Sequence, residues 1–218
     1  MSRNIDFAPG EFYHIFNHGN GDRLIFLDDD DKQRFVKLLY LMNSTNPIIL
    51  EDIPSNQEFF FDRGETIVDI GAYVLMDNHY HLLLKEKTEN GISKFMQKLV
   101  TAYTMYFNIK YQKRGTLFEG RFKARHISMD EYLRHMFAYI HLNPVKMIEP
   151  KWKKVGLVNL PAVDIFLQNY KFSSYLDYLE QPRLQNKILN REAFPHYFAS
   201  VKEVKTEMAE WLDFDNFD

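Results

Sequence analysis

Hydrophobic and polar residues alternate in several short segments of this chain, a pattern typical of strands that bury one face. In the first segment, Phe12, His14 and Phe16 alternate with Tyr13 and Ile15. The second and third segments are separated by Asp77-Asn78, a pair that favours a turn. The predicted strands cover residues 11–17, 66–76, 80–85 and 117–127.

Other segments carry apolar residues three or four positions apart, which predicts helices with one buried side. The predicted helices run from the acidic stretch Asp28–Asp31 to about Asn43, from Gly91 to about Tyr111, and from Asp130 to about Asn143. Gly115 ends the second helix, and Pro144 ends the third because proline cannot continue a helix.

The order of these elements is β, α, β, β, α, β, α. This order predicts an α+β fold, with a ferredoxin-like antiparallel sheet and helices on one face. We expect residues 1–150 to form this domain. Residues 151–218 are expected to form a small, mostly helical C-terminal extension packed on the outside.

The amino-acid composition excludes several classes of protein. Of the 218 residues, 45% are hydrophobic and 16% aromatic, which indicates a folded globular chain. Cysteine is absent, which excludes disulfides, thiolate zinc sites and cysteine nucleophiles. Apolar runs such as Leu82–Leu84 are too short to cross a membrane, and the first residues lack an apolar signal region. We therefore expect a cytoplasmic protein.

Charge is unevenly distributed along the chain, although the net charge is only −3. Residues 94–125 contain eight basic residues and one acidic residue, Glu119, so this segment carries +7. Lys151, Lys153 and Lys154 form a second basic cluster, and acidic residues gather at positions 28–31 and after Glu203. A basic segment can bind phosphate locally, but it can equally be a solvated charged face.

His79 and His81 flank Tyr80 at the start of a predicted strand. Residues two apart on a strand point to the same face, so the two imidazoles project together and can hold one divalent ion. Such a pair leaves coordination positions for water and a phosphate oxygen, which suits phosphodiester chemistry. The alternative for a bare His-x-His is two histidines at a strand end that are hydrogen-bonded or exposed to solvent, and a partner elsewhere in the chain is needed to support a metal site.

Tyr139 lies on the flank of the third predicted helix, roughly 110° from the centre of its apolar face. Asn143 is four residues further on, so the two side chains share one side of the helix if the helix extends that far. A phenol beside an amide is a plausible nucleophile at a metal-bound phosphate, and a nearby cation would favour the phenolate. His135, one turn earlier, is a candidate to assist. The alternative is an amphipathic tyrosine at the edge of the core.

Several of these segments together resemble the single-tyrosine insertion-sequence transposases with a histidine-hydrophobe-histidine strand, and in particular the REP-associated tyrosine transposase branch. The matching segments, in order along the chain, are Tyr13–Asn20, Met76–Leu84, Arg114–Lys123 and Tyr139–Lys146, with a weaker echo at Phe172–Tyr175. Members of the family often carry a basic residue where this chain has His18.

The resemblance implies that His79 and His81 bind Mg²⁺ or Mn²⁺ and that Asn143 is the third protein ligand. It implies that Tyr139 attacks a DNA phosphate, forms a 5′-phosphotyrosine and releases a 3′-hydroxyl. The strand is then rejoined without a nucleotide triphosphate, in agreement with the lack of a Gly-rich phosphate-binding loop. The expected partner is single-stranded DNA with hairpin-bearing ends.

DNA contacts are expected from the basic residues Arg114, Arg121, Lys123 and Arg125, the last three on one face of a strand. Phe118 and Phe122 belong either to the core or to a base-stacking surface. Two other functions remain open: a domesticated DNA-binding protein of the same fold without transposition, and a hydrolase that uses water in place of tyrosine. The protein is expected to be a monomer or a homodimer, with a preference for no exchange of the tyrosine helix.

Overall fold

A computed structural model describes residues 6–152, 156–157 and 159–213 of the chain. Lys153, Lys154, Asp215 and Asp218, which contribute to the basic cluster and the acidic end expected from the sequence, lie outside the described residues. Within the described part, no helix combines the length and the apolar character needed to cross a membrane.

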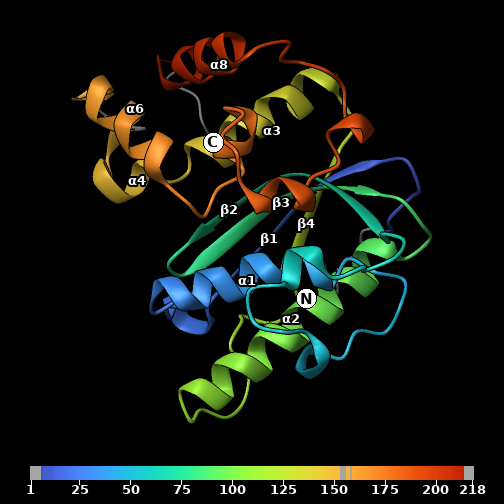
Figure 1. Cartoon of the computed structure of the whole chain (residues 1–218). Coiled ribbons are helices and arrows are strands. Elements are labelled where there is room, and N and C mark those ends of the chain that lie inside the picture. Colours follow the sequence, from blue (N-terminus) through green and yellow to red (C-terminus); the bar gives the residue numbers. More distant parts are fainter. Residues whose placement is uncertain (1–5, 153–155, 158, 214–218) are drawn as a thin grey trace.

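A four-stranded antiparallel sheet forms the centre of the molecule (Figure 1). Its strands are β1 (Phe12–His18), β2 (Val68–Met76), β3 (His79–Glu86) and β4 (Lys123–Ile127). The order across the sheet is β2-β3-β1-β4, and every neighbouring pair is antiparallel. The predicted α+β class and ferredoxin-like antiparallel sheet are confirmed.

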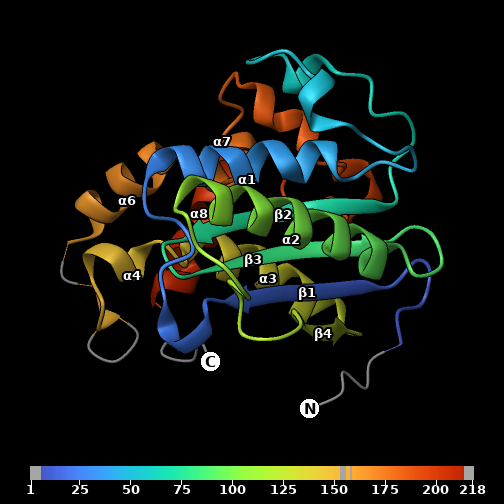
Figure 2. The same cartoon turned by 90° about the horizontal axis from the view of Figure 1, so that it is seen from below.

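The helices α1 (Asp29–Leu41) and α2 (Gly91–Lys110) pack on one face of the sheet (Figure 2). The side chain of Asp28 caps α1 by accepting a hydrogen bond from the backbone N–H of Asp31 at 2.9 Å. The phenyl ring of Phe35 packs against Tyr80 of β3 with ring centroids 5.0 Å apart. Tyr80 is fully buried in this layer.

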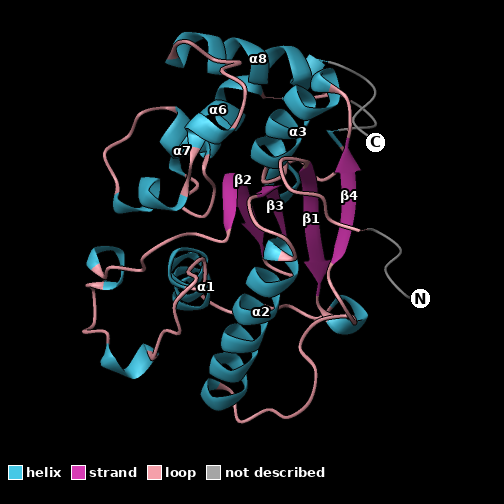
Figure 3. Ribbon diagram, turned by 90° about the vertical axis from the view of Figure 1, so that its right-hand side faces the viewer, coloured by secondary structure: helices cyan, strands magenta, loops and turns pink. Residues whose placement is uncertain are grey.

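The helix α3 (Asp130–Leu142) lies on the opposite face of the sheet, where it contacts β2, β3 and β4 (Figure 3). Helices therefore cover both faces, whereas the sequence analysis placed them on one. The reason lies in the chain after β4, because α3 has its own buried stripe, which includes Leu133, Phe137 and Ile140. The face of β2 and β3 opposite α1 and α2 also carries buried apolar side chains, those of Ala72, Val74 and Leu83. Two apolar surfaces of this kind bury each other.

Further short helices complete the C-terminal part of the chain. They are α4 (Val145–Ile148), α6 (Leu160–Asn169), α7 (Tyr175–Tyr178) and α8 (Val201–Asp213). The helix α8 runs along the outer side of α3 (Figure 1). Part of the acidic end is therefore an amphipathic helix: Val204 and Met208 are buried, and the Glu207 carboxylate accepts hydrogen bonds from the Arg134 guanidinium.

The predicted strand over residues 117–127 is wrong in its first half. Only Lys123–Ile127 is a strand, and Phe118 instead forms an isolated bridge with Gly19. Gly120 adopts φ +65°, a left-handed conformation that interrupts an extended strand. Arg121 therefore precedes β4, so the expected alternation of Arg121 with Lys123 and Arg125 on one strand does not occur.

Candidate active site

His79 and His81 lie on β3, a central strand that is paired on both sides. Their rings project from the same face of the sheet, with centroids 5.1 Å apart and planes at 85°. Tyr80 between them points into the opposite layer, where its ring contacts Phe118. The alternation of a strand thus directs both imidazoles toward α3, as the His-x-His spacing predicted.

The Nδ1 atom of each of the two histidines lies within hydrogen-bonding distance of another side chain. His79 Nδ1 lies 2.6 Å from Asn78 Oδ1, and His81 Nδ1 lies 2.8 Å from His14 Nε2 of β1. An amide oxygen accepts hydrogen bonds, so the proton of His79 is on Nδ1 and the lone pair is on Nε2. Nε2 is therefore the nitrogen through which His79 can bind a metal.

Burial keeps His79 and His14 neutral. It lowers the pKa of His79 to about 4, with smaller contributions from the positive charge of Lys146 and from His18. Burial also lowers the pKa of His14 to about 3, with a smaller contribution from Arg125. Since a neutral imidazole is the form that binds a metal, the environment of His79 suits a ligand role near neutral pH.

Tyr139 brings its ring against the same histidines from α3. Its centroid lies 5.4 Å from that of His81 at 85°, and 5.6 Å from that of His14 at 73°. The side chain is half-buried, in agreement with its predicted position on the flank of the helix. The structure thus brings the ring of the candidate nucleophile against His81, one member of the histidine pair, within one chain.

Asn143 is the C-cap residue of α3 and is buried. Its Nδ2 atom donates a hydrogen bond to the backbone carbonyl of Tyr139 at 2.9 Å, and its Oδ1 atom is buried without a hydrogen-bond partner. Because a carbonyl can only accept, this bond also fixes which amide atom is oxygen. A buried amide oxygen without a donor costs free energy, and a divalent cation would satisfy it.

Two imidazoles and one amide oxygen are a small donor set for a metal. Among the described residues, no group of three or more His, Cys, Asp or Glu side chains is arranged to hold an ion. The predicted set of His79, His81 and Asn143 does not need such a group. A catalytic site with open positions takes its remaining ligands from water and a substrate phosphate, so a set of two imidazoles and one amide oxygen is chemically compatible with one.

Other side chains near the site have mixed roles. The His135 ring lies 6.3 Å from that of Tyr139, but it stacks more closely on Trp211 of α8, at 4.3 Å and 24°. His18, opposite His79 in the register of β1 and β3, places Nε2 2.7 Å from a carboxylate oxygen of Glu119. The Nζ atom of Lys123 lies 3.3 Å from the same nitrogen.

The four basic residues expected to contact DNA are all exposed but are not placed alike. Lys123 pairs with Phe16 and Arg125 pairs with His14 across β1 and β4, so both share the face of the histidines. Arg121 lies just before β4. Arg114 lies beyond the end of α2, which packs on the opposite face of the sheet.

The +7 segment does not form one continuous surface. The Lys110 ammonium pairs with Asp28 and with the fully buried carboxylate of Asp31, both at 2.8 Å. The Lys98 ammonium donates to the backbone carbonyl of Ser44 at 2.6 Å. Lys98 and Lys110 of α2 therefore serve contacts with α1 and the loop after it. The basic part on the same face as the histidines is β4.

The two phenylalanines of this region separate into different environments. Phe118 is buried in the core between Tyr80 and Tyr103, so it is not a base-stacking surface. Phe122 is half-buried and stacks on Phe7, with centroids 6.3 Å apart.

Sequence analysis missed three residues that surround the candidate site: His14, Asn78 and Lys146. Asn78 was assigned to turn chemistry, and Lys146 follows Asn143 in the same motif without an assigned role. His14 was visible only as one position of an alternating strand. Its contact with His81 spans 67 positions in the sequence and becomes apparent only when β1 pairs with β3.

Comparison with known proteins agrees with this geometry. Residues 63–143 match the family described as "Transposase IS200 like", a range that includes the histidine pair, Tyr139 and Asn143. No curated protein matches the chain. The family match supports a transposase and confirms the resemblance inferred from the sequence motifs.

A solved structure also resembles the chain. It is described as "Structure of the REP associates tyrosine transposase bound to a REP hairpin". The TM-score is 0.51 at 15% sequence identity, and the alignment covers 85% of this chain and 90% of that chain. At this identity the likeness establishes a shared fold.

Proposed function

We propose that this chain is a metal-dependent transposase of single-stranded DNA that uses Tyr139 as its nucleophile. The observation that carries the proposal is the placement of the Tyr139 ring against His81, one turn of helix from Asn143, whose buried amide oxygen has no hydrogen-bond partner among the described residues. The family match over residues 63–143 supports the same reaction class. Hairpin-bearing ends are the proposed substrate because the similar solved structure is described as bound to a hairpin.

His79, His81 and Asn143 would hold Mg²⁺ or Mn²⁺ in this proposal. The ion, when bound, polarises the phosphate under attack and neutralises part of its charge. His79 supplies Nε2 because its Nδ1 proton is donated to Asn78. Asn143 supplies Oδ1 because its Nδ2 is committed to the backbone of Tyr139. The bond from Asn143 also links the ligand and the nucleophile through one turn of helix.

Tyr139 attacks the phosphorus atom through its phenolic oxygen. The P–O3′ bond breaks, the tyrosine becomes joined to the 5′ side of the break through a phosphodiester, and the other strand end leaves with a 3′-hydroxyl. The ester conserves the energy of the broken bond, so attack by a 3′-hydroxyl on the phosphotyrosine rejoins DNA and regenerates the phenol.

Lys123 and Arg125 lie on the same face as the histidines and would neutralise the DNA backbone that leads into the site. Arg121 and Arg114 extend this surface at its margin. Tyr139 meets the histidines of its own chain, which favours cleavage by one protomer without exchange of α3. A monomer is therefore sufficient for the proposed reaction, and a homodimer is compatible with it.

The test is a cleavage assay on hairpin-containing single-stranded DNA with Mg²⁺ or Mn²⁺, analysed by denaturing electrophoresis. The wild-type protein should form a covalent protein–DNA band. Tyr139→Phe should lose it, whereas Tyr132→Phe, a matched change on the same helix, should keep it. Cutting by Tyr139→Phe would overturn the proposal in favour of water attack. Binding of several hairpins without cutting would favour a domesticated DNA-binding protein.

A further inference from the structure

His14 of β1 is buried in contact with His81 of the candidate metal site, and its Nε2 atom is engaged by that histidine and not available to an ion. Its Nε2 atom forms a 2.8 Å hydrogen bond with His81 Nδ1. In this bond the N–H of one ring points at the lone pair of the other, so the two atoms cannot both direct lone pairs at one ion. The contact instead determines where the single proton of the His81 ring resides.

Two arrangements of protons satisfy this hydrogen bond. If His14 donates from Nε2, the His81 lone pair is on Nδ1 and its proton is on Nε2, which prevents Nε2 from binding a metal. If His81 donates from Nδ1, its Nε2 carries the lone pair and His14 accepts as the Nδ1-protonated tautomer. Only in the second arrangement does His81 carry its proton on Nδ1 and its lone pair on Nε2, as His79 does through its hydrogen bond to Asn78.

We propose that His14 is a positioning residue that accepts the Nδ1 proton of His81 and so directs His81 Nε2 toward the metal. This inference rests on the proposed function, because it assigns a role toward the metal that the cleavage reaction would use. Metal-binding histidines commonly donate their second N–H to an acceptor, which sets the tautomer and the orientation of the ring.

The surroundings of His14 hold its ring in the orientation that this role requires. The ring stacks on Phe16 and on His81, with centroids 5.0 Å apart in both cases and interplanar angles of 25° and 24°. The Tyr139 ring meets it edge-on at 5.6 Å. Its strand is paired on both sides, with β3 and with β4, so the backbone under His14 is fixed.

Packing alone does not account for a histidine at position 14, because a hydrogen-bond acceptor is required as well. Phenylalanine would keep the contacts with Phe16 and Tyr139 but would leave the Nδ1–H of His81 without an acceptor. Glutamine can place its amide oxygen near the position of the imidazole Nε2 and accept that proton. Comparing His14→Phe with His14→Gln therefore separates the effect of the hydrogen-bond acceptor from the effect of side-chain packing.

The experiment measures Mn²⁺ affinity of the full-length protein by electron paramagnetic resonance, in a Tyr139→Phe background that prevents chemistry. His14→Phe should weaken Mn²⁺ binding by about 10–100-fold. His14→Gln should recover most of the affinity, and neither change should alter the DNA-free circular dichroism spectrum. In parallel, long-range ¹H–¹⁵N spectra of the Mg²⁺-loaded wild-type protein should show the His81 proton on Nδ1, with the His81→Ala spectrum identifying that ring.

The outcomes distinguish this inference from the proposed function. Unchanged Mn²⁺ affinity in His14→Phe, beside abolished binding in His81→Ala, would overturn only the role of His14. Absence of Mn²⁺ binding by the wild-type protein would overturn both. A His81 proton found on Nε2 in the loaded protein would also overturn the inference, and that measurement does not depend on any variant at His14 folding.

Discussion

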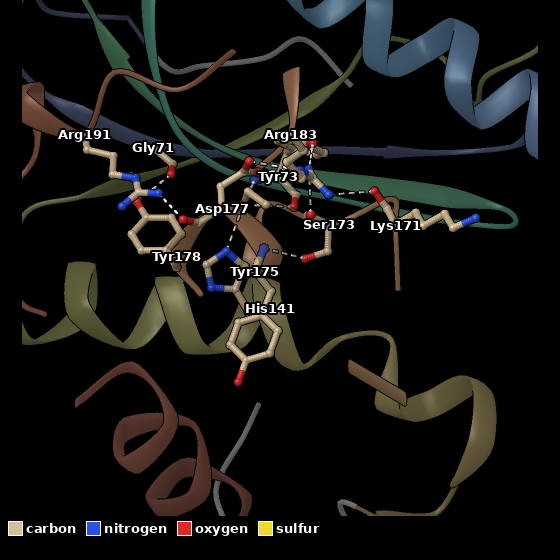
Figure 4. A network of polar contacts seen from close by, with 11 residues as sticks. Gly71, Tyr73, His141, Lys171, Ser173, Tyr175, Asp177, Tyr178, Arg183 and Arg191 are labelled. Atoms are coloured by element: carbon tan, nitrogen blue, oxygen red, sulfur yellow. Dashed lines mark hydrogen bonds and ion pairs between the residues drawn. The ribbon is translucent and has the colours of Figure 1, made fainter. Parts of the chain in front are cut away.

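Ser174 joins the C-terminal segment to both β2 and α3, and its replacement should reveal how strongly α3 is anchored. Its Oγ atom accepts a hydrogen bond from the backbone N–H of Tyr73 at 2.9 Å and lies 2.8 Å from His141 Nε2. Both partners are buried. The surrounding network of Tyr73, Asp177, Arg183 and neighbouring residues is shown in Figure 4.

The loss in free energy of unfolding expected for Ser174→Ala follows from the buried groups that would lose their hydrogen-bond partner. The Tyr73 carbonyl would still accept from the Ser174 backbone N–H, but the Tyr73 N–H would lose its acceptor. The His141 ring would lose its Nε2 bond, and its Nδ1 atom is already buried without a partner. A buried polar group left unpaired costs about 1–3 kcal/mol, so two such groups predict a loss of about 2–6 kcal/mol.

Ser173→Ala is the matched control because Ser173 is equally buried but its Oγ accepts only the backbone N–H of Tyr175, at 3.1 Å. Its expected cost is about 1–2 kcal/mol. The assay is equilibrium urea unfolding followed by circular dichroism, with the free energy of unfolding extrapolated to water. A loss in Ser174→Ala no larger than that in Ser173→Ala would refute the anchoring of α3 through His141.

Three further predictions follow from the site and its surroundings. Asn143→Ala should weaken Mn²⁺ binding by about 10-fold or more while Asn143→Asp retains it, as measured by calorimetry, because the aspartate keeps an oxygen ligand. Arg125→Ala should lower the slope of log affinity for single-stranded DNA against log salt by about 1, and Lys94→Ala, an exposed position on α2, should leave the slope unchanged. Lys110→Met should reduce the free energy of unfolding by about 2–4 kcal/mol because it leaves the buried Asp31 carboxylate without the Lys110 ammonium. Urea unfolding measures this loss, and a loss near zero would contradict the prediction.

Local periodicity was sufficient to predict those parts of the fold whose signals lie within a few residues. Alternation on a strand placed His79 and His81 on one face, and helical spacing placed Tyr139 on the flank of α3. Both features depend only on neighbouring positions. Proline at position 144 likewise ends α3 near Asn143, where the structure places the C-cap.

Features that depend on distant segments could not be predicted in the same way. The +7 segment is continuous in sequence, but α2 and β4 pack on different parts of the sheet, so Lys110 pairs with Asp28 and Asp31 and not with a DNA-binding surface. The helix α3 was assigned to the wrong face because its amphipathic pattern gives the side that is buried but not the surface that buries it. The contact of His14 with His81 required the register of β1 and β3.

The chemical identity of the covalent bond between protein and DNA is the most direct test of Tyr139 as the nucleophile. The protein should be trapped on hairpin-containing single-stranded DNA with Mg²⁺, the DNA trimmed with nuclease, and the peptides analysed by mass spectrometry. The account predicts a nucleotide joined through its 5′-phosphate to Tyr139, and a free 3′-hydroxyl on the released strand. An adduct on another residue, or cleaved strands with a 5′-phosphate and no protein attached, would contradict it.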